Sequence, residues 1–375
     1  RLHAPLVLST SALEGGAAAA ARLAGRWPNP LLDVRGENLG ARGPLVPDPD
    51  IFTVLTEQVE LGGKRGYRRA IAEADADAAT AVRRDAERQV ALDTVHTYMR
   101  ALRARDVGAS LTQQRASLET LIEQLRRRVA EGYAAEADLL RLTTEDTRLL
   151  LESARTRAEL TRALADLGRL MGSETVPQAA QLQRPAAVAV PAVDGAALAS
   201  AVATRPDVAV ASAREARGEA VASLEHARRL PDPSVTTGYK RTQQHNTLIA
   251  GVTLSVPLFE HNGQARALAD AARRAAAVDA LGVRQRAEAD ARQAIETARQ
   301  LAEAADGVRQ VLLAPADGVR DAARATFREG TADILKLVDA ERVYAEAQRE
   351  AVAVAIDAYV AAMDARFALA QEEMP

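Results

Sequence analysis

Residues 248–259 alternate between large apolar side chains and small or polar ones. The apolar positions of one set are Leu248, Ala250, Val252, Leu254, Val256 and Leu258, and the positions between them are Ile249, Gly251, Thr253, Ser255 and Pro257. A period of two puts the first set on one face of a β-strand and the second, mostly small or polar, on the other. Over about ten residues this pattern is typical of a strand in a membrane β-barrel, although a half-buried strand of a soluble sheet shows it as well.

Three more strands are predicted, and the four pair as two hairpins. The other strands are expected at residues 31–38, 51–61 and 234–240. The loops 39–50 and 241–246 are polar or rich in Gly and Pro, and are expected to be exposed hairpin tips. The strand at 51–61 is less regular, because Glu57 falls on the face that corresponds to Leu254, where lipid would oppose a charge.

Long helices are predicted after each hairpin. Residues 67–131 contain no Pro, and their apolar side chains recur at helical spacing. At roughly 1.5 Å per residue, such a helix would be on the order of 100 Å long. Residues 264–329 repeat this length, with Pro315 expected to kink or break the helix near its far end.

Each long helix is expected to turn at a glycine and return as a second helix. The turns are predicted at Gly132 and Gly330, and the returning helices at 138–170 and 333–369. A left-handed glycine is a common residue at a helix end. Each half of the chain would then be a strand hairpin followed by a helical hairpin.

The two halves resemble each other in sequence. Seven residues of the first half recur 197 positions later, namely Val59, Leu61, Gly66, Arg69, Ala70, Ala72 and Ala74. The two turn glycines are 198 apart, and a Pro-x-Pro sequence at 28–30 and at 231–233 precedes each strand hairpin. Two repeats of this length indicate a duplication rather than a solenoid.

The remaining segments complete a predicted division of the chain. It consists of an N-terminal helical segment (1–26), a first β-hairpin (27–62), a first helical hairpin (63–172), a connector (173–204), a helix (205–230), a second β-hairpin (231–259), a second helical hairpin (260–370) and a tail (371–375). The connector is rich in Pro and small residues and is expected to be irregular. Thr204, Pro206 and Asp207 form a plausible helix start, with Thr204 as the cap.

Composition narrows the class of protein. The 375 residues include no Cys and only 4 Phe, 6 Tyr and 1 Trp. Disulfides, thiolate metal sites and Cys nucleophiles are therefore excluded. With few aromatic residues and much alanine, thin and closely packed helices are expected rather than a thick core. The net charge of −3 gives no reason to expect nucleic acid as a partner.

No stretch approaches the roughly 18–20 apolar residues of a membrane-spanning helix, so a helical membrane protein is not expected. Residue 1 is Arg, which we interpret as the start of a processed or shortened chain.

No catalytic, metal or cofactor site is expected. The five histidines show no metal-ligand spacing, and no Ser/His/Asp set or cofactor motif stands out. The Gly62-Gly63-Lys64-Arg65 sequence lacks the first Gly and the hydroxyl residue of a phosphate-binding loop, so we interpret it as a strand-to-helix turn. The sequence therefore does not predict an enzyme.

Four strands are too few to close a barrel, and a lone helical hairpin leaves an apolar face uncovered. Copies arranged around an axis would solve both problems, because closure removes strand edges and helices cover one another. The predicted architecture is a ring of strands joined to a tube of helices.

The motifs resemble those of the TolC family, the outer-membrane exit ducts of efflux pumps and type I secretion systems. The matching stretches are Pro28-Asn29-Pro30, Arg205-Pro206-Asp207-Val208, Leu254-Ser255-Val256-Pro257-Leu258-Phe259 with Gly263, and Phe327-Arg328-Glu329-Gly330 with Leu337-Val338-Asp339-Ala340-Glu341-Arg342. Gln58-Val59-Glu60-Leu61-Gly62-Gly63-Lys64-Arg65 resembles the CzcC-like branch that serves heavy-metal RND pumps.

The resemblance implies a mainly α protein with membrane β-barrel strands, in the trimeric TolC-like α/β-barrel architecture. A homotrimer in the outer membrane would form a twelve-strand barrel in contact with lipid, with helices that extend into the periplasm. Its expected partners are a periplasmic adaptor and an inner-membrane RND transporter, and its expected cargo is heavy-metal cations. A drug-efflux or secretion duct of the same family, or a soluble periplasmic coiled-coil protein, are the alternatives.

The resemblance also assigns roles to residues at the helix turns. Adaptor contact is expected at Gly132, Tyr133, Asp138, Phe327, Gly330 and Thr331. The tunnel gate is expected at Asp333, Lys336 and Asp339. The acidic gate positions of the family fall on Lys336 and Asp339, and Lys336 reverses the sign of the charge. A pair of Lys336 with Asp339 or Asp333 could latch the gate, with solvated surface charge as the alternative.

Overall fold

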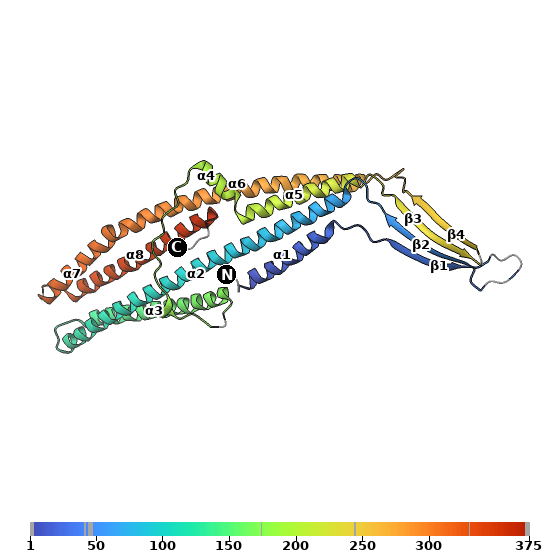
Figure 1. Cartoon of the computed structure of the whole chain (residues 1–375). Coiled ribbons are helices and arrows are strands. Elements are labelled where there is room, and N and C mark those ends of the chain that lie inside the picture. The colour runs from blue at the N-terminus through green and yellow to red at the C-terminus, as the bar shows by residue number, and fades with distance from the viewer. Residues whose placement is uncertain are drawn as a thin grey trace. The chain divides into compact units, whose positions relative to one another are not determined.

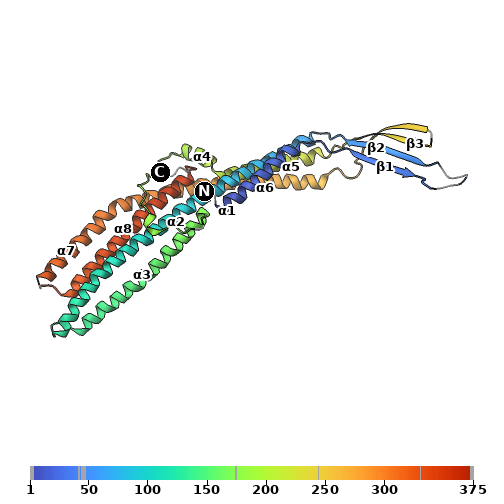
Figure 2. The same cartoon turned by 60° about the horizontal axis from the view of Figure 1, so that its bottom comes forward.

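A computed structural model describes residues 4–40, 43, 48–173, 175–243, 245–329 and 331–371, which form two compact units. One unit comprises Arg1–Ser9, Arg84–Arg205 and Gln285–Pro375, and the other comprises Thr10–Arg83 and Pro206–Arg284. Figure 1 shows the elements in chain order and Figure 2 shows them from a second direction. Within the described residues, none of the helices combines the length and hydropathy needed to cross a membrane.

The order of elements confirms the predicted duplication. The first half runs through α1 (Pro5–Ala24), β1 (Leu31–Glu37), β2 (Asp50–Gln58), α2 (Lys64–Ala130) and α3 (Glu136–Met171). The second half runs through α5 (Pro206–Ala227), β3 (Ser234–Thr242), β4 (His245–Thr253), α6 (Gly263–Val308), η2 (Arg309–Leu313), α7 (Ala314–Arg328) and α8 (Ile334–Ala368). Each half is thus a helix, a strand hairpin and a long helical hairpin.

The connector between the halves is more ordered than the sequence indicated. It contains a short 3-10 helix, η1 (Ala179–Gln181), and α4 (Gly195–Ala203). The prediction of an irregular segment is therefore wrong for these residues. The expected cap at Thr204 is also wrong, because its hydroxyl donates to the carbonyl of Ala201 and so completes the end of α4.

The four strands form one antiparallel sheet in the order β1-β2-β3-β4. The prediction for the fourth strand is wrong at its far end, because β4 stops at Thr253 and residues 254–259 lie outside the sheet. Thr253 pairs with Ser234, the first residue of β3. Before Ser234 stand Pro231 and Pro233, which lack the N–H that a longer ladder would need.

The strands also reach into the turn that the sequence assigned to residues 241–246. β3 extends to Thr242 and β4 begins at His245, so the expected six-residue loop is wrong. In the first hairpin, half of the predicted exposed tip at 39–50, namely residues 41–42 and 44–47, lies outside the described residues, and Asp50 already belongs to β2.

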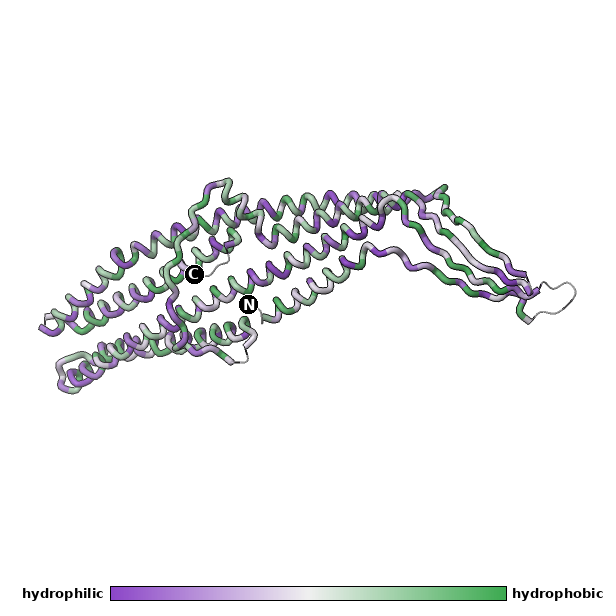
Figure 3. The backbone as a smooth tube through the Cα atoms, in the orientation of Figure 1, coloured by the Kyte–Doolittle hydropathy of each residue, from purple (hydrophilic) through white to green (hydrophobic). Residues whose placement is uncertain are grey.

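The two faces of the sheet differ in polarity, as its register shows. The face called here the apolar face carries Leu32, Val34, Ile51, Leu55, Val235, Tyr239, Leu248, Ala250 and Val252, together with Thr53, Glu57, Thr237, Arg241 and Asn246. The other, called the polar face, carries Asp33, Arg35, Asp50, Thr56, Thr236, Lys240, Thr242 and Thr247, together with Leu31, Phe52, Val54 and Ile249. Along the strands, the tube in Figure 3 accordingly changes between hydrophobic and hydrophilic colours.

Contacts on the two faces differ. On the polar face, Lys240 Nζ lies 2.7 Å from a carboxylate oxygen of Asp50, and Thr56 and Thr236 form a cross-strand hydroxyl pair. On the apolar face, large side chains are exposed, with Leu248 at 87% and Val252 at 71%. Glu57 lies on this face opposite Val235, one residue from the end of β2.

The helical hairpins bury mainly small side chains. Alanine makes up half of the buried apolar residues in the described part of the chain, as the composition indicated. One cluster joins α2, α3 and α8 and has Leu102, Leu164 and Phe367 among its members. The alanine side chains let the helices approach closely, and the larger side chains of this cluster fill the space between them.

Pro315 interrupts the long helix of the second half, as expected. Its ring would clash with the carbonyl four residues earlier, and it has no N–H to donate to that carbonyl. The chain responds with the π-helical turn η2, at Arg309–Leu313, directly before α7. The interruption is a wider turn, and the chain stays helical through it.

Gly238 provides a test of the sheet. A Cβ added there would lie 2.8 Å from the Thr53 carbonyl oxygen, whereas one at Gly251, also on the polar face, would meet nothing within 4 Å. We expect Gly238→Ala to lower the free energy of unfolding by about 1–3 kcal/mol, the usual cost of overpacking. Thermal unfolding in detergent would measure this. Gly251→Ala is the matched control, and an equal loss in both variants would contradict the steric argument.

Candidate functional site

The turn between α2 and α3 is closed by a glycine in the left-handed conformation. Gly132 has φ of 77°, and its N–H donates to the carbonyl of Val129. The next N–H, of Tyr133, reaches back to the carbonyl of Arg128 at 2.8 Å. These two bonds form a Schellman motif, which satisfies the last carbonyls of α2 and reverses the chain. The helix-ending role predicted for Gly132 is confirmed.

The turn between α7 and α8 repeats part of this bonding pattern. The N–H of Thr331 donates to the carbonyl of Thr326 at 3.0 Å, the same five-residue step as from Tyr133 to Arg128. Donor and acceptor are each displaced by 198 residues from those of the first turn, which is the offset of the sequence repeat. Gly330, which the sequence placed at this turn, lies outside the described residues.

An apolar cluster lies between the helices next to both turns. Its buried members come from α2, α3 and α8, and include Leu125, Leu142 and Ile334. Phe327 packs against this cluster, and the guanidinium carbon of Arg128 lies 5.6 Å from the centre of its ring. The two helical hairpins are thus held together just behind their turns, which lie at the same end of this unit in Figures 1 and 2.

The predicted contact residues divide into exposed and supporting side chains. Tyr133 is 80% exposed, and Thr331 is exposed as well. Phe327 is half-buried and packs inward, and Asp138 is a half-buried acid in the first turn of α3. Tyr133 is therefore the large side chain that this set presents to solvent.

The predicted latch is not formed in this structure. Asp339 pairs instead with Arg342, at 2.7 Å, on the same helix. Asp333 occupies the cap position of α8 without a side-chain cap hydrogen bond, and its carbonyl accepts from the Lys336 N–H. Among the ion pairs of the described residues, none joins Lys336 to Asp333 or Asp339. The gate role of these residues stays a prediction.

Charged contacts within the hairpins were not predicted from the sequence. Arg320 lies over the ring of Tyr344 at 3.8 Å, and Arg324 pairs with Glu341 at 2.5 Å, so α7 and α8 are joined twice. These partners lie 17 or more residues apart in the chain. They fall outside the three- and four-residue spacing that identifies pairs along one helix.

His96 lies at an interface between two helices. Its Nε2 is 2.7 Å from a carboxylate oxygen of Asp364, so the pair joins α2 to α8. The hydrogen bond to Asp364 raises the pKa of His96. Across the described ranges, no group of three or more His, Cys, Asp and Glu residues is arranged to hold a metal ion.

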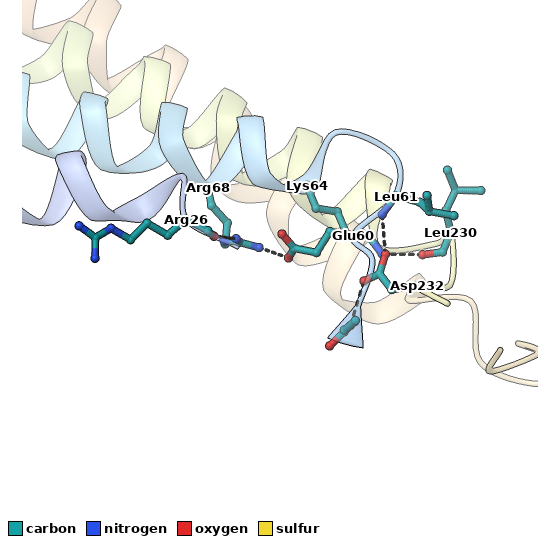
Figure 4. Close-up of polar contacts among 8 residues, drawn as sticks. Arg26, Glu60, Leu61, Lys64, Arg68, Leu230 and Asp232 are labelled. Carbon is teal, nitrogen blue, oxygen red and sulfur yellow. Dashed lines mark hydrogen bonds and ion pairs between the residues drawn. The ribbon is translucent and has the colours of Figure 1, made fainter. Parts of the chain in front are cut away.

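A second polar site lies where strands change into helices, in the other unit (Figure 4). The ammonium group of Lys64 is almost completely buried and donates to Asp232 Oδ1 at 2.7 Å and to the Leu230 carbonyl at 2.6 Å. Asp232 also accepts from the Leu61 N–H and from the Gln58 side chain. One ion pair therefore ties the turn after β2 to the turn before β3.

The turn at Gly62 and Gly63 positions Lys64. Both glycines have positive φ, of 70° and 76°, and α2 begins at the next residue. The predicted strand-to-helix turn is confirmed. Beside it, Arg68 pairs with Glu60 and also donates to the backbone carbonyl of Arg26.

Removing the charge of Asp232 tests this junction. Asp232→Asn should lower the free energy of unfolding by about 3 kcal/mol, because the buried Lys64 loses its counter-charge. The exposed pair of Arg217 and Asp75, at 2.8 Å in the same unit, is a matched control, and Asp75→Asn should cost less than about 1 kcal/mol.

A double variant isolates the pair. Lys64→Met in the Asp232→Asn background should recover part of the lost stability, since the uncompensated charge is then gone. Denaturant unfolding of all the variants measures these differences. Equal losses for Asp232→Asn and Asp75→Asn would show that the junction pair has no special weight.

Two known resistance proteins are similar to this chain in sequence. No family model matches the chain. The nickel and cobalt resistance protein CnrC of Cupriavidus metallidurans is 30% identical over 268 residues, 69% of this chain and 62% of that protein. The cobalt-zinc-cadmium resistance protein CzcC of the same organism is 26% identical over 236 residues, 58% of this chain and 56% of that protein. The matches thus span about three fifths of these relatives' length.

Solved structures show the same fold over nearly the whole chain. The outer membrane channel CmeC of Campylobacter jejuni superimposes with a TM-score of 0.85 at 15% identity, covering 98% of this chain and 83% of that one. A membrane protein from Pseudomonas aeruginosa gives 0.84 at 20% identity, covering 98% and 90%. The resemblance predicted from the sequence is confirmed: the chain is similar in sequence to the heavy-metal resistance proteins CnrC and CzcC and has the fold of the TolC-like outer-membrane channels.

Proposed function

We propose that this protein is the outer-membrane exit duct of a tripartite RND-type efflux pump, and that the pump exports heavy-metal cations. The fold supports the duct, and the names of the sequence relatives support the cargo, because they are resistance proteins for nickel, cobalt, zinc and cadmium. The observation that carries the proposal is the sheet. Its apolar face is exposed, and β1 and β4 are its edge strands.

The sheet supports a membrane location and a homotrimer. Exposed Leu, Ile and Val side chains on one face suit contact with lipid, while the ion pairs and hydroxyls of the other face suit a polar interior. If β1 of one copy pairs with β4 of the next, three copies give twelve strands and no free edge. Glu57 and Arg241, the charged residues of the apolar face, are compatible with this arrangement because each stands one residue from a strand end, where charges cost least.

The helical turns support a periplasmic partner. Tyr133 is exposed at a turn that two backbone hydrogen bonds close, and large aromatic side chains are favoured anchors at protein interfaces. In this proposal the turns at Gly132 and Thr331 meet the adaptor, while Asp333, Lys336 and Asp339 lie at the tunnel entrance. No catalytic chemistry is required, because the duct only conducts ions that the pump delivers.

Tolerance to metals tests the cargo. Deleting the gene should lower the tolerated concentration of nickel, cobalt, zinc or cadmium, and the wild-type gene should restore it, while tolerance to drugs stays unchanged. A fall in drug tolerance alone would assign the duct to a drug pump.

Purification tests the membrane location and the trimer. The purified protein should need detergent and migrate as a trimer, and a monodisperse monomer in plain buffer would favour a soluble coiled-coil protein.

Two aromatic residues test the adaptor contact. Tyr133→Ala should reduce metal tolerance with no change in thermal stability, because its side chain is exposed. Phe327→Ala is the control for packing, and should lower the free energy of unfolding by about 1–3 kcal/mol because the ring is half-buried. Full tolerance in the Tyr133→Ala strain at normal protein levels would remove this turn from the proposed interface.

A further inference from the structure

A pocket of about 760 Å³ lies between the end of α1 and the start of α2, and its lining is rich in arginine. The basic side chains that line it are Arg22, Arg26, Lys64, Arg65 and Arg69, and the acidic ones are Glu60 and Glu73. All of them belong to the same compact unit. The lining therefore carries more positive than negative side chains.

Internal pairs account for part of this charge. Lys64 is bound by Asp232, Arg69 lies 2.7 Å from Glu73, and Glu60 is paired with Arg68. Within the described residues, no ion pair or hydrogen bond engages the guanidinium groups of Arg22, Arg26 and Arg65. Figure 4 shows the guanidinium of Arg26 clear of the other side chains drawn there, while its backbone carbonyl accepts from Arg68. Three positive groups are thus left available at one pocket.

An aromatic ring orders one of these groups. The guanidinium carbon of Arg65 lies 4.6 Å from the centre of the Trp27 ring, a cation-π contact. Trp27 is itself 52% exposed. The stacking holds the charge of Arg65 at the pocket and leaves its N–H groups free to donate to an anion.

The pocket lies beside one end of the sheet. Trp27 comes four residues before β1, and Arg65 comes seven residues after β2 ends. Apolar side chains are exposed on the segments that flank this end, with Leu61 at 43%, Leu230 at 48% and Phe259 at 97%. A guanidinium cluster next to exposed apolar residues and a tryptophan is a combination suited to the boundary between lipid chains and phosphate headgroups.

We propose that this pocket binds the phosphate group of a membrane phospholipid, with Arg22, Arg26 and Arg65 as its ligands. Guanidinium groups bind phosphate through paired charge-assisted hydrogen bonds. The acyl chains would follow the exposed apolar residues toward the apolar face of the sheet. The assignment rests on the proposed membrane location, and it places the strand-to-helix boundary at the level of the headgroups.

Binding to the purified full chain tests the site. In a neutral detergent, the probes are dihexanoylphosphatidylglycerol, dihexanoylglycerol, which lacks the phosphate, and inorganic phosphate, and native mass spectrometry measures the bound fraction. We expect the phospholipid to bind, and Arg22→Gln, Arg26→Gln and Arg65→Gln each to weaken binding about fivefold, the usual effect of one basic residue near a lipid surface. Arg274→Gln, an exposed arginine on α6 in the same unit, should change nothing.

Each other outcome has a defined meaning. Binding of dihexanoylglycerol equal to that of the phospholipid would overturn the phosphate site. Equal binding of inorganic phosphate would make it a site for the free anion and overturn the headgroup assignment. Undiminished phospholipid binding in the triple variant would also overturn it, once unchanged thermal unfolding shows that the variant is folded.

The binding assay is independent of the proposed function. Cell fractionation and metal tolerance of the wild type test the duct, whereas the probes test the pocket on purified protein. A chain that binds the phospholipid but confers no metal tolerance would keep the site and refute the duct's cargo. An outer-membrane duct that fails to bind it would do the reverse.

Discussion

The ion pair of Lys64 and Asp232 fixes the geometry on which the sheet depends. Asp232 lies between two prolines, and its carboxylate accepts hydrogen bonds from the Lys64 ammonium and from the Leu61 N–H. The pairing of β2 with β3 begins directly beside it, with Gln58 opposite Ser234. A shift of one residue at this point would turn every side chain of a strand to the opposite face. The separation of the two faces therefore rests on a contact at the ends of the central strands β2 and β3.

The same junction sets the start of the long helices. Two consecutive left-handed glycines form the turn after β2, and Lys64, whose side chain is held by Asp232, is the first residue of α2. From there to Ala130 the helix has no proline, and its buried apolar residues are mostly alanine up to residue 104 and leucine or isoleucine beyond it. Small side chains bury little area each, so stability has to come from length and from many helix contacts. The charged pairs between α7 and α8 supplement this thin packing.

The sequence predicted elements that depend on local signals, and missed details that depend on distant partners. The long helices follow from the absence of proline and from apolar spacing, and Pro315 marked its own interruption. The end of β4 depends on the prolines before β3, some twenty residues away, so its own alternation continued past the true end. Thr204 lies between α4 and α5, and its hydroxyl could cap either helix. In the structure it donates to the carbonyl of Ala201, at the end of α4.

The candidate site shows the same division. The glycine at residue 132 identified the first turn, because a left-handed position there has few other solutions. The pair of Lys64 and Asp232 joins residues 168 apart, and no local pattern connects them. For Asp339, Lys336 and Arg342 stand at equal spacing on either side, so the sequence offered two partners, and in the folded helix Arg342 holds the carboxylate. Local spacing thus defines which pairs are possible, and only the packed structure selects among them.

The duplication conserves backbone bonding while the side chains diverge, and this bears on recognition. Both turns use the same bond across five residues, at positions 198 apart, yet one presents Tyr133 and the other Thr331. The backbone solution is shared because each helix end has the same carbonyls to satisfy. The side chains carry no such requirement and are free to differ. A partner that binds both turns would therefore contact two turns with similar backbones and different side chains. Because only one of them carries an aromatic side chain, the partner could tell the two turns apart and bind in one orientation.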